Sequence, residues 1–87
     1  MISKELEVLN RAGIHARPAS EIAKTASTFS SDIFFEKENM KINAKSIMGV
    51  ITLGATYKTK ILCTASGSDE KEAIEALDDL FKRRFEI

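Results

Sequence analysis

Residues 13–29 read GIHARPASEIAKTASTF and contain a helical pattern that begins beside a histidine. The apolar residues recur every three or four positions, as on one face of an amphipathic helix of about three turns: Ala19, Ile22, Ala23, Ala26 and Phe29. Pro18 is tolerated within the first turn, where a backbone N–H has no intrahelical partner to lose. The helix is therefore predicted to begin near His15 or Ala16.

Four segments outside this helix are predicted to be β-strands, most clearly where apolar and polar residues alternate. They cover residues 2–9, 33–36, 40–44 and 60–65. The short connection between the second and third segments predicts a hairpin, in which Asn39 can adopt a positive φ, although less readily than glycine.

A short helix is predicted over residues 47–53. Ser46 is a favoured N-cap residue directly before it, and Gly54 can end it. Because so short a helix cannot bury every side, at least one of Ile47 and Met48 is expected to be exposed.

The last predicted helix has an apolar stripe made of Ala73, Ile74, Leu77, Leu80, Phe81 and Phe85. Asp69 with Glu72 is predicted to form a capping pair at its start. The basic stretch Lys82 to Arg84 complements the helix dipole at its end, and no role beyond helix termination is assigned to it.

The predicted order β-α-β-β-α-β-α fits a single domain of residues 1–87. One apolar face per strand and one apolar stripe per helix favour two layers, with helices covering one face of a sheet. The 13 acidic and 13 basic residues balance, so the composition provides no overall attraction to nucleic acid or to an anionic membrane. Any site for an anion must be local.

Cys63 is the only cysteine, so no internal disulfide can form and a reducing compartment is expected. Its inward position predicts a buried, inert thiol. No signal peptide and no run of 18 apolar residues are found, so a cytoplasmic protein without membrane insertion is expected. A single histidine far from a single cysteine does not form a metal site, and no cofactor is expected.

His15 is the candidate functional residue. Helix N-termini bind anions through free N–H groups and the helix dipole, and Arg17 adds a guanidinium that can fork onto phosphoryl oxygens. Ala12 and Gly13 have little bulk, so a partner protein can approach closely. Free imidazole is largely neutral and nucleophilic at pH 7. From spacing alone, phosphoryl transfer competes with a surface or capping histidine that has no chemistry.

Two motifs resemble one known family. Gly13 to Ala19, GIHARPA, is similar to the active-site signature of HPr, the histidine-containing phosphocarrier of the phosphoenolpyruvate-dependent sugar phosphotransferase system. Ala44 to Val50, AKSIMGV, resembles the regulatory-serine segment of that family. The resemblance runs over essentially the whole chain. It implies an α+β, open-faced β-sandwich, with a four-stranded antiparallel sheet covered on one face by three helices.

The resemblance also implies roles for particular residues. His15 would be phosphorylated by enzyme I and would pass the phosphoryl group to sugar-specific IIA domains, with Arg17 as its electrostatic partner. Ser46 would be phosphorylated by an HPr kinase/phosphorylase and read by a catabolite-control regulator. Ile47, Met48 and Ala16 are predicted to bind partner proteins.

The resulting prediction is a monomeric phosphocarrier, transiently phosphorylated on histidine, rather than an enzyme. The alternative is a regulatory binding module that is controlled at Ser46 and does not serve sugar transport. A small hydrolase or kinase is not supported, because the sequence has no paired carboxylates, nucleotide-binding loop or metal cluster.

Overall fold

A computed structural model describes residues 1–85 of the chain. The elements follow one another as β1 (Ile2–Glu7), α1 (Ala16–Ser27), β2 (Asp32–Lys37), β3 (Met40–Asn43), α2 (Ile47–Leu53), β4 (Lys60–Ser66) and α3 (Glu70–Lys82). The predicted order β-α-β-β-α-β-α is confirmed, and α1 begins where Pro18 requires it. Within residues 1–85, none of the helices is long and apolar enough to cross a membrane.

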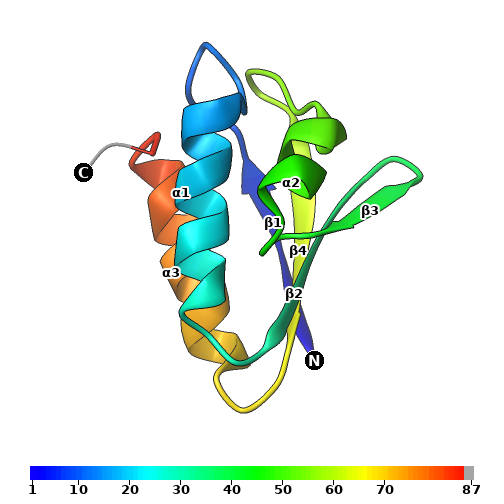
Figure 1. Cartoon of the computed structure of the whole chain (residues 1–87), viewed down its shortest axis with the longest axis vertical. Coiled ribbons are helices and arrows are strands. Elements are labelled where there is room, and N and C mark those ends of the chain that lie inside the picture. Colours follow the sequence, from blue (N-terminus) through cyan, green and yellow to red (C-terminus); the bar gives the residue numbers. More distant parts are fainter. Residues whose placement is uncertain (86–87) are drawn as a thin grey trace.

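The sheet has the strand order β1-β4-β2-β3, and every neighbouring pair is antiparallel. The last strand in the sequence, β4, therefore lies between the first and the second. The helices α1 and α3 run side by side, and α2 packs against α1 and β3 (Figure 1). This arrangement confirms the predicted α+β, open-faced sandwich.

The core lies between the sheet and the helices. Alternate strand residues are buried, as in β4, where Ile61, Cys63 and Ala65 point inward while Leu62 is 41% exposed. Phe35 of β2 packs edge to face against Phe81 of α3, with ring centroids 5.8 Å apart. Burial raises the pKa of the Cys63 thiol to about 12. The prediction of a buried thiol is therefore confirmed.

In the hairpin between β2 and β3, the residue with a positive φ is Glu38 rather than Asn39. Lys37 pairs with Met40, so Glu38 and Asn39 form the two-residue loop. Glu38 adopts the positive φ, at +57°, and Asn39 does not. A positive φ at the first of two loop residues is the pattern of a type II′ turn, whose twist suits a hairpin.

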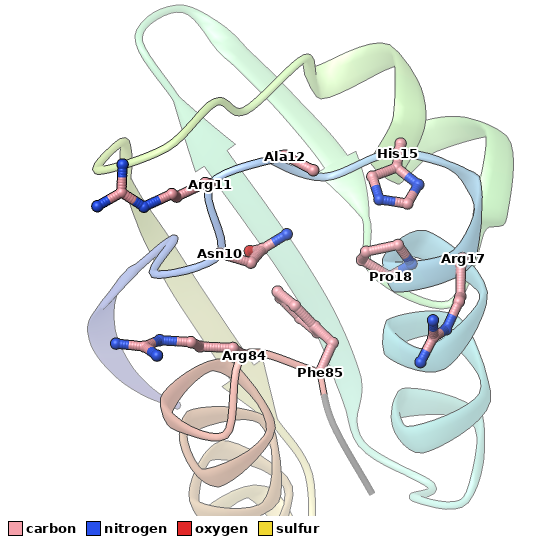
Figure 2. Close-up of a pocket in the computed structure, with 8 residues that line it drawn as sticks. All are labelled: Asn10, Arg11, Ala12, His15, Arg17, Pro18, Arg84 and Phe85. Carbon is pink, nitrogen blue, oxygen red and sulfur yellow. The ribbon is translucent and has the colours of Figure 1, made fainter.

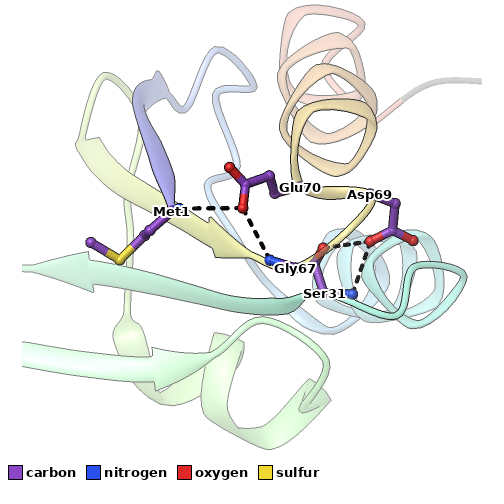
Figure 3. Close-up of polar contacts among 5 residues, drawn as sticks. All are labelled: Met1, Ser31, Gly67, Asp69 and Glu70. Carbon is purple, nitrogen blue, oxygen red and sulfur yellow. Dashed lines mark hydrogen bonds and ion pairs between the residues drawn. The ribbon is translucent and has the colours of Figure 1, made fainter.

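The predicted capping pair at the start of α3 is wrong. Asp69 is the N-cap residue, but its side chain makes no cap hydrogen bond. Its carboxylate instead accepts a hydrogen bond from the backbone N–H of Ser30 at 2.9 Å. It also accepts hydrogen bonds from the backbone N–H of Ser31 at 2.9 Å and from the Ser31 hydroxyl (Figure 3). Because these donors come from the α1–β2 connection, the carboxylate joins two distant segments rather than capping its own helix.

The neighbouring Glu70 makes a second set of contacts at the same end of the molecule. Its Oε1 accepts a hydrogen bond from the backbone N–H of Gly67 at 3.1 Å and lies 3.3 Å from the N-terminal amine of Met1 (Figure 3). Gly67 is closely packed, since a Cβ there would lie 2.5 Å from the Ser31 hydroxyl oxygen. The turn before α3 is thus held by acidic side chains and by a glycine.

The pH dependence of stability tests the Asp69 contact. Hydrogen bonds from the Ser31 hydroxyl and the Ser30 backbone N–H lower the pKa of this carboxyl to about 2, against about 3.9 in an unfolded chain. The stabilisation is therefore complete above about pH 4 and is lost as the pH falls toward 2. We expect Asp69→Asn to unfold at a lower urea concentration than the wild type at pH 7, with a difference that shrinks between pH 4 and 2.

Glu75→Gln is the matched control, because Glu75 is an exposed residue of the same helix. This variant should follow the wild-type profile when unfolding is monitored by circular dichroism. A difference between wild type and Asp69→Asn that stays constant from pH 7 to pH 2 would show that the charge of Asp69 contributes nothing.

Candidate functional site

His15 is the N-cap residue of α1, with extended backbone angles of φ −107° and ψ −165°. Its carbonyl oxygen accepts a hydrogen bond from the Ala19 N–H at 2.9 Å. Its imidazole makes no cap hydrogen bond, and the residue is exposed. The backbone of His15 thus starts the helix while its ring stays available to another molecule.

The loop before His15 is held by short contacts. The Asn10 side chain donates a hydrogen bond to the Gly13 carbonyl at 2.6 Å, and the Ile14 N–H donates to the Ala55 carbonyl at 2.9 Å. Gly13 has a φ of +75°, and a Cβ there would lie 3.0 Å from the Ala55 oxygen. A glycine is therefore required for this approach, which fixes the position from which α1 begins.

A pocket of about 280 Å³ opens beside the histidine (Figure 2). It is lined by Asn10, Arg11, Ala12, His15, Arg17, Pro18, Arg84 and Phe85. In the described part of the chain, no acidic residue lines this pocket or lies in the first turn of α1. Within residues 1–85, the guanidinium groups of Arg11, Arg17 and Arg84 form no ion pair. The site is locally cationic in a chain with zero formal net charge.

The start of α1 adds to this character. The amides of Ala16 and Arg17 belong to the first turn, where N–H groups have no intrahelical partner, and Pro18 contributes none. An anion next to the ring would therefore meet two N–H groups, the positive end of the helix dipole and the Arg17 guanidinium. In residues 1–85 no group of three or more His, Cys, Asp or Glu side chains could hold a metal ion.

The predicted ends of α2 are confirmed. The Ser46 hydroxyl oxygen accepts a hydrogen bond from the Gly49 N–H at 3.0 Å, and Gly54 ends the helix with a φ of +68°. Ile47 and Met48 are 44% and 69% exposed. Because α2 packs against α1, these apolar side chains form an exposed patch on the helix next to the one that His15 begins.

The C-terminal turn contributes two pocket residues whose position was not predicted. The helix α3 ends at Lys82, and the Arg84 N–H donates to the Phe81 carbonyl while the Phe85 N–H donates to the Leu80 carbonyl, both at 3.0 Å. This pair of hydrogen bonds is the Schellman motif, in which the first residue beyond the cap is left-handed. Arg84 accordingly has a φ of +55°.

Phe85 anchors this turn. It was predicted as a continuation of the helical stripe, but it lies beyond the helix with a φ of +63°. Its ring is buried edge to face against Phe81, at 4.9 Å between centroids. An apolar residue two positions after a helix cap is a known companion of the Schellman motif, and this is the signal that could have located the turn.

The three basic residues at the end of α3 make different contacts. Lys82 Nζ lies 3.0 Å from Asp78 Oδ2, and Arg83 Nε lies 2.8 Å from Asp79 Oδ2. Both residues thus pair with carboxylates one turn earlier in α3. Arg84 leaves the helix and lines the His15 pocket instead.

Comparison with known proteins extends over both sequence and fold. The family model described as PTS HPr component phosphorylation site matches residues 2–83. The phosphocarrier protein HPr of Treponema pallidum is 43% identical over 86 residues, which are 99% of this chain and 98% of that protein. The HPr-like protein Crh of Bacillus subtilis is 43% identical over 77 residues, 88% of this chain and 91% of Crh.

The fold is similar to that of a solved relative. The crystal structure of HPr-C-His from Thermoanaerobacter tengcongensis aligns with a TM-score of 0.94 and 48% sequence identity, covering 98% of this chain and 96% of that one. The similarity therefore includes the elements that carry His15, Ser46 and the patch on α2.

Proposed function

The chain belongs to the HPr family of phosphocarrier proteins, and we propose that its His15 accepts a phosphoryl group from enzyme I and passes it to sugar-specific IIA domains. The observation that carries the proposal is the exposed imidazole at the start of α1, beside a pocket whose described lining contains arginines and no carboxylate. The chain then acts as a carrier that is consumed and regenerated, rather than as an enzyme.

The chemistry follows from these groups. A ring nitrogen of His15 attacks the phosphorus, a new N–P bond forms as the bond to the donor breaks, and the donor atom keeps the electron pair. Arg17 and the first-turn amides offset the charge on the phosphoryl oxygens. A helix end contributes at most about 2 kcal/mol, so the phosphoryl group is stabilised without being trapped, and the same step can run toward a IIA domain.

Docking is assigned to the apolar surface near the ring. Ile47 and Met48 are exposed on α2, and Ala16 is exposed at the start of α1. An exposed methionine can repack against differently shaped surfaces. This property suits a carrier that must bind its donor and its acceptors with one face.

A regulatory role for Ser46 is supported by its position and by the similarity to Crh, the catabolite repression HPr of Bacillus subtilis. A phosphoserine at a helix N-terminus adds about −1.5 to −2 charge where the dipole tolerates it. The fold would survive, while docking onto the adjacent Ile47 and Met48 would require desolvation of the phosphate. The modifying enzyme would be an HPr kinase/phosphorylase, and a catabolite-control regulator would read the modification.

Replacing the histidine tests the carrier function. We expect wild type incubated with enzyme I and labelled phosphoenolpyruvate to acquire an acid-labile label, as phosphohistidine does. His15→Ala should acquire none and should unfold at the wild-type denaturant concentration, because the imidazole makes no cap contact. A His15→Ala protein that is labelled at the wild-type rate would contradict the proposal.

Arg17→Ala should slow transfer from enzyme I and transfer to a IIA domain by about tenfold, or ~1.4 kcal/mol. Its guanidinium makes no ion pair within residues 1–85, so unfolding should change little. Arg17→Lys should recover part of the rate, and Lys71→Ala, which removes the same charge from α3, should leave both rates unchanged. Rates that stay within twofold of wild type in both directions would remove Arg17 from the mechanism.

Two substitutions at Ser46 separate capping from regulation. Ser46→Ala removes the hydrogen bond to the Gly49 N–H and should cost ~1 kcal/mol of stability without slowing phosphorylation of His15. Ser46→Asp retains a cap, so its stability should stay within ~1 kcal/mol of wild type, and its added charge should slow that reaction. If Ser46→Asp reacts as fast as wild type and no kinase labels Ser46, the serine is only a cap.

A further inference from the structure

A second pocket adjoins the His15 pocket on the side away from Arg17. It has a volume of about 380 Å³ and is lined by Leu9, Asn10, Arg11, Tyr57 and Arg84. Figure 2 shows the guanidinium groups of Arg11 and Arg84 on the same side of Asn10, opposite His15 and Arg17. The two arginines therefore flank the phosphoryl site without pointing at the histidine.

Among the described residues that line this pocket, the cations have no carboxylate neighbour. The Arg11 guanidinium lies 5.6 Å from the centroid of the Tyr57 ring, and the ammonium group of Lys58 lies 5.5 Å from the same centroid. Cation–π contacts hold such groups in place without neutralising their charge. The surface thus presents positive charge that the rest of the described chain leaves uncompensated.

The conformation of Arg84 indicates that its side chain has a use beyond the turn. A left-handed residue at this position is usually glycine, because a Cβ disfavours the conformation. The helix end is already complemented by Lys82 and Arg83, which pair with Asp78 and Asp79. The turn itself is anchored by the buried Phe85. Neither the helix nor the turn therefore requires a guanidinium at Arg84.

We propose that Arg11 and Arg84 form a cationic flank of the docking surface, which binds carboxylate side chains of the protein that donates the phosphoryl group to His15. The proposal rests on the proposed function, since it assigns a second contact to the same encounter. A guanidinium fork matches a carboxylate in a bidentate geometry. Arg17 and the N–H groups at the start of α1 already offset the charge of the phosphoryl group. The anion that binds at this flank therefore comes from the partner's surface.

This assignment gives the docking surface two chemically different sides. The apolar patch of Ile47 and Met48 lies on α2, whereas the cationic flank lies on the other side of Asn10 from His15 (Figure 2). Charge on one side orients a partner during diffusion and raises the association rate at low salt. The orientation in which the partner docks would then be set before the apolar contacts form.

Steady-state kinetics with enzyme I test the flank. Initial rates of His15 phosphorylation are measured as a function of the concentration of this protein, at 50 mM and at 500 mM salt. Arg84→Gly keeps the left-handed turn and removes the guanidinium, so we expect KM to rise two- to fivefold at low salt, the effect of one exposed ion pair. The double variant Arg11→Gln/Arg84→Gly should raise KM about tenfold. In both variants kcat should stay within twofold, and the difference in KM should disappear at high salt.

Matched variants separate this role from others. Arg84→Lys keeps the charge but loses the bidentate fork, so its KM should lie between those of wild type and Arg84→Gly. Lys71→Ala removes the same charge from the start of α3, roughly 18 Å away along the helix, and should leave KM unchanged. If Arg84→Gly fails to fold, Arg84→Asn takes its place, because asparagine also tolerates a left-handed backbone.

Three results would contradict the proposal of a cationic flank. A KM that is unchanged in Arg84→Gly and in the double variant at 50 mM salt would show that no partner carboxylate binds there. A fall in kcat that persists at 500 mM salt would place Arg84 on the phosphoryl group instead. A wild-type protein that enzyme I does not label at all would remove the proposed function and the flank with it.

Discussion

The insertion of β4 between β1 and β2 is the constraint on which the rest of the structure depends. Residues 60–66 pair with strands that come from the N-terminus and from the middle of the chain. The four-stranded sheet can therefore form only once β4, its last strand in the sequence, is in place. The antiparallel pairing with β1 sends the chain away from His15 along β4, and α3 must then run back. Its C-terminal turn consequently ends beside residues 10–18, where Arg84 and Phe85 join the His15 pocket.

The site shows how a chain without net charge can concentrate positive charge locally. Thirteen basic residues balance thirteen acidic ones, but the acidic groups that stabilise the fold lie elsewhere: Asp69 and Glu70 hold the turn before α3, and Asp78 pairs with Lys4 and Lys82. Among residues 1–85, the charged side chains that line the His15 pocket are all arginines. Positive charge is therefore concentrated at this pocket in a way that the balanced overall composition does not reveal.

The sequence predicted the elements well because their signals are local. Pro18 located the start of α1, and Ser46 with Gly54 bounded α2, since caps act on residues within one turn of themselves. Asp69 was misassigned because its partners, Ser30 and Ser31, lie 39 and 38 positions away and become neighbours only after β4 has paired. The place of Arg84 in the site could not be predicted for the same reason, because it follows from the direction in which α3 returns.

The thiol of Cys63 in β4 can report how often the core opens. Cys63 is the only cysteine of the chain, is fully buried in β4, and has a pKa raised to about 12 by that burial. A thiol-specific reagent in neutral buffer can therefore modify it only in molecules whose core around β4 has opened. The rate at which the folded protein is alkylated measures how often this core opens, without any label or substitution being introduced.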